Sequence, residues 1–176
     1  MDIVQTHSYR HAEAILQVVY PTEKKEIIEV LKTVSWVKYP EPKSRERHGR
    51  VVAVLTIDQN ETNHLIKTAF AEKGWTCGPE IISRSESRLK SDFKKGKIQV
   101  EVQFGNMARW YTDVFKFLLS YSADDIEVGV LVVPMQVTAN QIDENVVYYE
   151  RVVRELPHAK MGITIPIWII GVGSSN

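Results

Sequence analysis

Residues 91–106 read SDFKKGKIQVEVQFGN, and this stretch predicts a β-hairpin in the middle of the chain. Its second half, KIQVEVQF, alternates apolar and polar residues with the period of a half-buried strand. The apolar residues of that strand should face the core, whereas Glu101 and Gln103 point together to the opposite face. Gly96 permits a tight turn in FKKGK, which returns the chain so that Asp92 approaches the same place.

Two carboxylates and an amide oxygen would therefore converge, from Asp92, Glu101 and Gln103. Oxygen ligands of this kind suit a hard divalent cation such as Mg²⁺, whose natural use is phosphate chemistry. The cation would also relieve the mutual repulsion of the two acids. The alternative interpretation is that Asp92 caps a turn, and that Glu101 and Gln103 occupy the solvent-exposed face of an antiparallel strand.

Length and composition favour one compact intracellular domain spanning residues 1–176. The chain is 44% hydrophobic, which is enough for a sizeable core without disulfides, and Cys77 is its single cysteine. It has no pattern of a signal peptide, and its apolar stretch ITIPIWIIGVG is interrupted by Pro166 and too short to span a membrane. We therefore expect a cytoplasmic protein. The 22 basic and 22 acidic residues cancel, so any attraction to nucleic acid must come from a local basic surface.

Apolar residues three and four positions apart predict helices along most of the chain. The expected helices are HAEAILQVV (11–19), PTEKKEIIEVLKTV (21–34), ETNHLIKTAFAEKGW (61–75), RWYTDVFKFLLSYS (109–122) and NVVYYERVVREL (145–156). Pro21 suits a first helical turn. Thr62 or Asn63 is the expected cap of the third helix, and Gly74 its end.

Four apolar or alternating runs predict strands: VVAVLTI (51–57), KIQVEVQF (97–104), EVGVLVVPM (127–135) and IPIWIIGV (165–172). KYPEPKSRERHGR (38–50) is expected to be a loop, because it holds two prolines, a glycine and many basic residues. Strands alternating with helices indicate an α/β fold whose sheet has some parallel pairing.

Several of these blocks, in the same order, resemble one enzyme family. VEVQFGN followed by an aromatic helix, then VGVLVVPM, YYE and IPIWIIGV, is similar to the BglII and BstYI group of type II restriction endonucleases, in the PD-(D/E)xK superfamily. HAEAIL and TNHLIKTAFAEKGW extend the resemblance over most of the chain. Asp92 with Glu101-Val102-Gln103 is its most specific part, because this group has glutamine where most of the superfamily has lysine. The resemblance implies a PD-(D/E)xK nuclease core, a central mixed β-sheet flanked by helices.

The same resemblance implies an activity and roles for the central residues. It implies a homodimer that cuts a short palindromic site in double-stranded DNA by Mg²⁺-dependent hydrolysis, leaving 5′-phosphates. Asp92 and Glu101 become metal ligands, the carbonyl of Val102 an additional one, and Gln103 helps to orient the attacking water. With glutamine at 103, no nearby ammonium is expected to activate the nucleophile, and the ion must do most of this. Relatives carry a further polar or acidic group before the catalytic Asp, for which Glu80 is the candidate and Glu72 and Cys77 are alternatives.

The resemblance also suggests residues that contact DNA. Asn106 lies where relatives read bases, and its amide can bond adenine through two hydrogen bonds. The tract NQIDENVV suggests further groove contacts from Asp143, Glu144 or Asn145. The basic residues of KSRERHGR and KKGK are candidates for phosphate contacts, although such runs are often only solvated; they are Arg47, Arg50, Lys94 and Lys95. A target that contains GATC is suggested by the relatives alone.

Two other functions remain open from the sequence. A nuclease of this superfamily that acts in repair or without sequence preference would need the catalytic residues but not Asn106 or residues 143–145. A relative that binds DNA without cutting it would have no physical reason to keep two repelling carboxylates together, so Asp92 and Glu101 argue against it.

Overall fold

The computed structural model describes residues 1–47, 50–81 and 89–174, and excludes the side chains of residues 47, 50, 52 and 53. Its centre is a six-stranded mixed sheet of order β1-β8-β7-β6-β5-β4. The strands β6, β7 and β8 are parallel, and the other pairs are antiparallel. The strand bounds are β1 Asp2–Tyr9, β4 Thr76–Cys77, β5 Phe93–Lys95, β6 Ile98–Val102, β7 Val128–Pro134 and β8 Ile167–Gly173.

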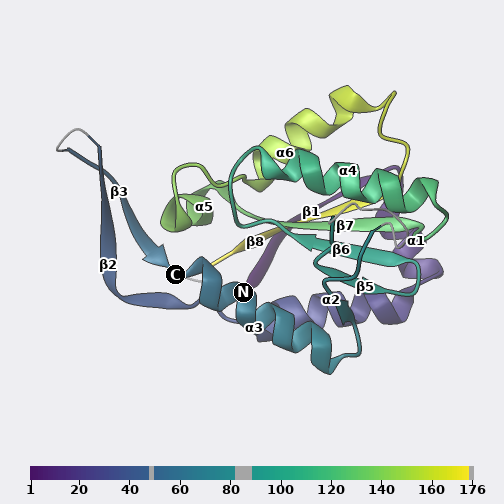
Figure 1. The fold of residues 1–176 in the computed structure, drawn as a ribbon, viewed down its shortest axis with the longest axis horizontal. Helices are drawn as coiled ribbons and strands as arrows, with labels where there is room; N and C mark the ends of the chain where they lie inside the picture. The colour runs from purple at the N-terminus through teal and green to yellow at the C-terminus, as the bar shows by residue number, and fades with distance from the viewer. Residues whose placement is uncertain (48–49, 82–88, 175–176) are drawn as a thin grey trace.

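Helices cover both faces of this sheet (Figure 1). One face packs against α1, α2 and α3, and the other against α4 and α6. Alternate residues of the buried strands point to opposite faces: Val130 and Val132 join the first core, and Leu131 and Val133 the second. The helix bounds are α1 Ala12–Val18, α2 Pro21–Thr33, α3 Gln59–Glu72, α4 Arg109–Ser122, α5 Gln136–Ile142 and α6 Tyr149–Glu155, followed by a 3₁₀ turn Leu156–Ala159.

The expected α/β fold with a mixed, helix-flanked sheet is confirmed. β7 and β8 are buried along their whole length, as expected of apolar runs in the centre of a sheet. Pro21 begins α2 as predicted. No helix within the described residues is long and apolar enough to cross a membrane.

The segment expected to be a loop before residue 50 is instead a strand. β2 (Lys38–Arg47) pairs with β3 (Arg50–Ile57) in a separate two-stranded antiparallel ribbon, which extends away from the main sheet (Figure 1). The loop prediction was wrong because prolines are tolerated on a strand whose outer edge has no partner, and the pairing register shifts between Lys38 and Lys43, around both prolines. The strand predicted at 51–57 is confirmed, but it lies in this ribbon.

Sequence periodicity missed other features. β1 pairs with β8 at the edge of the sheet, and α5 occupies a stretch for which no element was expected. The cap of α3 is also earlier than expected. The Asp58 carboxylate accepts hydrogen bonds from the backbone N–H groups of Asn60 and Glu61, so the helix begins at Gln59 rather than after Thr62 or Asn63.

Candidate active site

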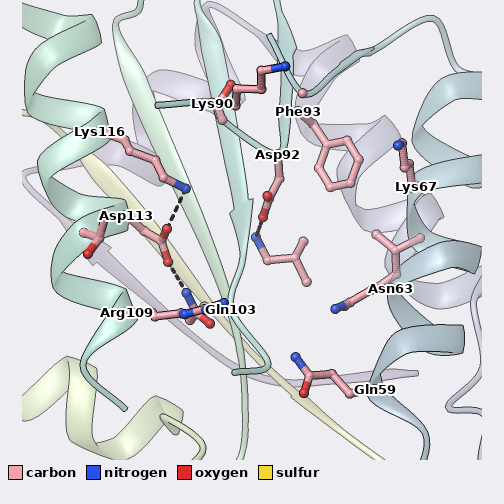
Figure 2. A pocket seen from close by; sticks show the side chains of 15 residues that line it. Gln59, Asn63, Lys67, Lys90, Asp92, Phe93, Gln103, Arg109, Asp113 and Lys116 are labelled. Atoms are coloured by element: carbon pink, nitrogen blue, oxygen red, sulfur yellow. Dashed lines mark hydrogen bonds and ion pairs between the residues drawn. The ribbon is translucent and has the colours of Figure 1, made fainter. Parts of the chain in front are cut away.

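A cavity of about 570 Å³ lies between α3 and α4, where β5 and β6 form its floor (Figure 2). Polar residues from all of these elements face it. α3 contributes Gln59, Asn63 and Lys67, the hairpin region contributes Lys90, Ser91, Asp92 and Gln103, and α4 contributes Arg109, Thr112, Asp113 and Lys116. The predicted hairpin therefore lies at the centre of this polar cavity.

The β5–β6 hairpin places Asp92 as the sequence predicted. Phe93 pairs with Val100, so Asp92 falls beside Glu101 one step further along the ladder. Gly96 forms the turn with φ of 54°, a left-handed conformation that glycine adopts without strain. The Asp92 carboxylate accepts a hydrogen bond of 2.8 Å from the Val102 N–H, which fixes it against β6. Burial raises the pKa of Asp92.

Glu101 is completely buried on the face of β6 that packs against α4. Its Oε1 accepts from the Gln99 amide at 2.8 Å, and its Oε2 lies 2.7 Å from the Lys116 ammonium. Burial, reinforced by the charge of Asp92, raises the pKa of Glu101 to about 8. The alternative that Glu101 and Gln103 occupy an exposed strand face is therefore wrong.

An ammonium does stand near the paired acids, contrary to the sequence expectation. Lys116 is presented by α4, and its Nζ also contacts Asp113 Oδ1 at 2.9 Å. Burial disfavours its charged form, but Glu101 and Asp113 outweigh that cost and raise the pKa of Lys116, so it stays charged. Sequence reasoning missed both residues of α4. The only available signal was an acid and a lysine three positions apart on a predicted helix, a pattern common on exposed helices.

Gln103 is held by the protein through both of its polar atoms. Its Nε2 donates to Asp113 Oδ2 at 2.6 Å, and its Oε1 accepts from the Gly105 N–H at 3.0 Å. A continuous chain of contacts thus runs from Glu101 through Lys116 and Asp113 to Gln103, two legs of which Figure 2 draws as dashed lines. The role of Gln103 in orienting a water stays a prediction, and the structure shows that it also orients Asp113.

The donor set fits a hard divalent cation. Asp92 and Glu101 lie opposite each other at the end of the β5–β6 pairing and offer carboxylate oxygens, and burial raises the pKa of both. Within the described residues no three His, Cys, Asp or Glu side chains form a ready metal cage. This is compatible with Mg²⁺, which usually takes one or two protein carboxylates and completes its shell with water and phosphate.

The structure does not bring Glu80 to this cavity. Its side chain is exposed, and its backbone forms a bridge with Lys90 at the outer end of the hairpin region. Asp113 is instead the second acid, beside Asp92, that lines the cavity. The assignment of Glu80 to catalysis remains a sequence prediction, to which the described contacts add no support.

Candidate base-reading residues from two distant segments lie together after β6. Asn106 forms a backbone bridge with Val146, and the Met107 N–H donates to the Asn145 carbonyl at 2.6 Å. Asp143, in the same segment, forms an ion pair with Arg45 of the β2–β3 ribbon. Glu144 is adjacent in the chain. The structure therefore gathers the predicted groove contacts at one place, next to the ribbon.

The residues predicted to contact phosphates differ in their surroundings. Lys94 forms an ion pair with Asp125, and Lys95 with Glu26, so these ammonium groups are already engaged within the protein. Arg47 and Arg50 lie at the paired ends of β2 and β3, but their side chains fall outside the described residues. Neither Lys94 nor Lys95 lines the cavity; among the described side chains, the cations that do are Lys67, Lys90, Arg109 and Lys116.

Two solved structures share this fold. The crystal structure of restriction endonuclease BglII complexed with a DNA 16-mer matches with a TM-score of 0.79, 21% identity, and coverage of 97% of this chain and 76% of that one. Free BglII matches with a TM-score of 0.67 and 21% identity, over 96% of this chain and 78% of that one. Comparison with curated protein sequences gives no match. The fold is thus that of a restriction endonuclease.

The family follows from the sequence itself. The model of the family described as restriction endonuclease BglII/BglIII matches residues 4–172, nearly the whole chain. The chain belongs to the BglII/BglIII restriction endonuclease family, and it is a type II site-specific endonuclease that acts on DNA.

Proposed function

We propose that this endonuclease hydrolyses both strands of double-stranded DNA at a short palindromic site, using Mg²⁺ and leaving 5′-phosphate ends. The observation that carries this proposal is the carboxylate of Glu101, buried beside Asp92, whose own side chain lines a polar cavity in a chain of this family. Burial raises the pKa of both acids, and a bound divalent cation would lower the cost of placing their charges side by side.

Asp92 and Glu101, with the Val102 carbonyl, would hold the ion. When bound, Mg²⁺ supplies charge neutralisation at the phosphodiester and lowers the pKa of water. The chain itself fixes the geometry: the Val102 N–H holds the Asp92 carboxylate, and the Gln99 amide holds that of Glu101. Gln103, restrained by Gly105 and Asp113, would orient the attacking water.

DNA would approach the side of the molecule on which α3, the hairpin region and the segment after β6 meet. Lys67 and Lys90 are exposed at the cavity and would contact phosphates, whereas Asn106 and residues 143–145 would read base edges. A GATC centre in the target is supported only by resemblance. A homodimer would match the two-fold symmetry of a palindrome, with one active site for each strand. Such an enzyme would act in the cytoplasm.

The decisive experiment is digestion of a defined unmodified genome by the purified protein in Mg²⁺, followed by sequencing of the fragment ends. We expect discrete fragments whose ends share one palindrome and carry 5′-phosphates. EDTA and the variant Glu101→Ala should each abolish cleavage. Glu41→Ala, which removes an exposed acid of the ribbon, is the matched control and should leave the fragment pattern unchanged.

A smear of fragments that requires both the metal and Glu101 would indicate a nonspecific nuclease instead of a site-specific one. Absence of cleavage, with retained binding to duplex DNA, would instead indicate a catalytically inactive relative. Substitution of Asn106 by Ala separates the first two outcomes independently. It should change or abolish the cut site of a site-specific enzyme, and should leave the products of a nonspecific one unchanged.

A further inference from the structure

Lys116 stands between Glu101 and the cavity. Its ammonium lies 2.7 Å from Glu101 Oε2, and its side chain lines the cavity, whereas Glu101 is fully buried and does not. Figure 2 shows Lys116 reaching from α4 toward the floor formed by the hairpin. A cation that enters from the cavity therefore meets the ammonium of Lys116 before it can reach the carboxylate of Glu101.

Lys116 has a second partner that allows it to leave Glu101. Asp113, one turn earlier on α4, accepts from the same ammonium at 2.9 Å and itself lines the cavity. The Lys116 side chain is 14% exposed and lines the cavity, so it borders the open side of the site. A long, flexible lysine side chain can thus turn toward the cavity while Asp113 continues to stabilise its charge.

We propose that Lys116 is a catalytic residue that yields Glu101 to the divalent cation and moves its ammonium onto the DNA phosphate in the cavity. This inference rests on the proposed function. A divalent cation and an ammonium repel each other at one carboxylate, so binding of the ion displaces the lysine. The positive charge of Lys116 then faces the phosphoryl oxygens, where negative charge grows in the transition state.

The chemical step balances without another reactant. The water oxygen forms a bond to phosphorus, the bond from phosphorus to O3′ breaks, and the phosphate stays on the 5′ side. The water loses a proton to solvent, and the departing O3′ gains one from solvent. Lys116 keeps its proton throughout and acts only through its charge and its hydrogen bonds.

The first test measures binding of Mn²⁺ to the DNA-free protein by electron paramagnetic resonance at one fixed pH. Lys116→Met removes the competing charge, and it should bind Mn²⁺ more tightly than the wild type, by roughly fivefold or more. Lys116→Arg keeps a positive charge and should bind it like the wild type. Lys25→Met, on the exposed part of α2, is the matched control. In a Glu101→Gln background, Lys116→Met should have no effect on Mn²⁺ binding.

The second test measures single-turnover cleavage at saturating Mg²⁺. Lys116→Met should cleave slower by about 100-fold or more, while its binding to DNA in EDTA stays close to that of the wild type. Tighter metal binding combined with slower cleavage is a pattern that a merely structural lysine would not give. Circular dichroism of each variant confirms folding, and Lys116→Gln serves as the second neutral variant if Lys116→Met does not fold.

Unchanged or weaker Mn²⁺ binding by both neutral variants would overturn the displacement of Lys116 by the ion. Wild-type cleavage rates in those variants would overturn its catalytic role. A wild-type protein that cuts no DNA would refute the proposed function instead, and the Mn²⁺ measurement, which uses no DNA, would still decide whether Lys116 competes for Glu101.

Discussion

Glu101 is the residue on which the chemistry depends, because its carboxylate is buried and coupled to Asp92. Desolvation penalises its charged form, and the single ammonium of Lys116 offsets this only in part. Burial therefore makes the charged form of Glu101 costly in the metal-free protein, and a bound divalent cation would relieve that cost. The same burial excludes water from the Glu101 carboxylate, and this strengthens its attraction to a cation.

The raised pKa of Glu101 gives a specific pH dependence of stability in EDTA. The pKa is about 8 in the folded protein, against an ordinary value of 4.5, so the folded state binds more protons than the unfolded state between these values. The free energy of unfolding should fall as pH rises through this window. Glu101→Gln should flatten most of that slope, whereas the exposed control Glu41→Gln should retain it. Urea unfolding from pH 5 to 9 measures both, and parallel slopes for the two variants would contradict the assignment.

At the scale of elements, α3 forms the wall of the cavity opposite α4. Gln59, Asn63 and Lys67 are four residues apart and share one face of the helix, which Figure 2 shows turned toward the hairpin. Ile66 and Phe70 lie next to this row on the helix and pack into the core, which anchors α3 against the sheet. The wall therefore presents two amides and one cation to any DNA that enters.

The cations at the edge of this wall should set the salt dependence of DNA binding. The double variant Lys67→Ala/Lys90→Ala should bind duplex DNA more weakly for every sequence, and its plot of log affinity against log salt should be shallower by about 2. Lys94→Ala/Lys95→Ala, whose ammonium groups are paired with Asp125 and Glu26, should change the slope less. Fluorescence anisotropy over a range of salt concentrations distinguishes them. If both double variants changed the salt slope equally, the ion pairs of Lys94 and Lys95 would have to break when DNA binds, contrary to this prediction.

At the scale of the whole molecule, the described part of one chain holds one such pair of neighbouring acids, Asp92 and Glu101, at the polar cavity. Cutting both strands of a palindrome in one event needs two such sites related by a two-fold axis. The ribbon of β2 and β3 extends beyond the sheet and is tied by Arg45 to Asp143, next to the segment that approaches Asn106. This arrangement enlarges the surface that each chain can offer to a duplex.

We expect the protein in solution to have twice the mass of its chain, as measured by light scattering after gel filtration. The assembly should persist on supercoiled plasmid, where both strands should be cut without a long-lived nicked intermediate. A monomeric mass, together with accumulation of nicked plasmid, would contradict the homodimer. Mixing wild type with Glu101→Ala should give nicked plasmid from mixed dimers, because only one strand meets an intact site.

The pattern of residues 91–106 was sufficient to predict the hairpin and the convergence of Asp92 with Glu101, and the alternation of strands and helices along the chain predicted the α/β class. These features depend on strand alternation and turn chemistry, which are local and visible in sequence. The match of residues 4–172 to the family agrees with the resemblance seen in the motifs. Prolines misled the prediction for β2, because their effect depends on whether a strand edge is paired, and sequence does not show that.

Tertiary structure alone decided the surroundings of the acids. Lys116 and Asp113 reach Glu101 and Gln103 only because α4 packs on the β6 face that carries them, and no local pattern records which helix covers which face. The same packing buries Glu101 and sets its pKa, while other contacts pair Lys94 and Lys95 and leave Lys67 and Lys90 at the cavity. The sequence by itself determined which acids meet, since neighbours in one hairpin are fixed by local geometry. The fold decided their charge, their access and their cationic partner, since these depend on contacts between distant segments.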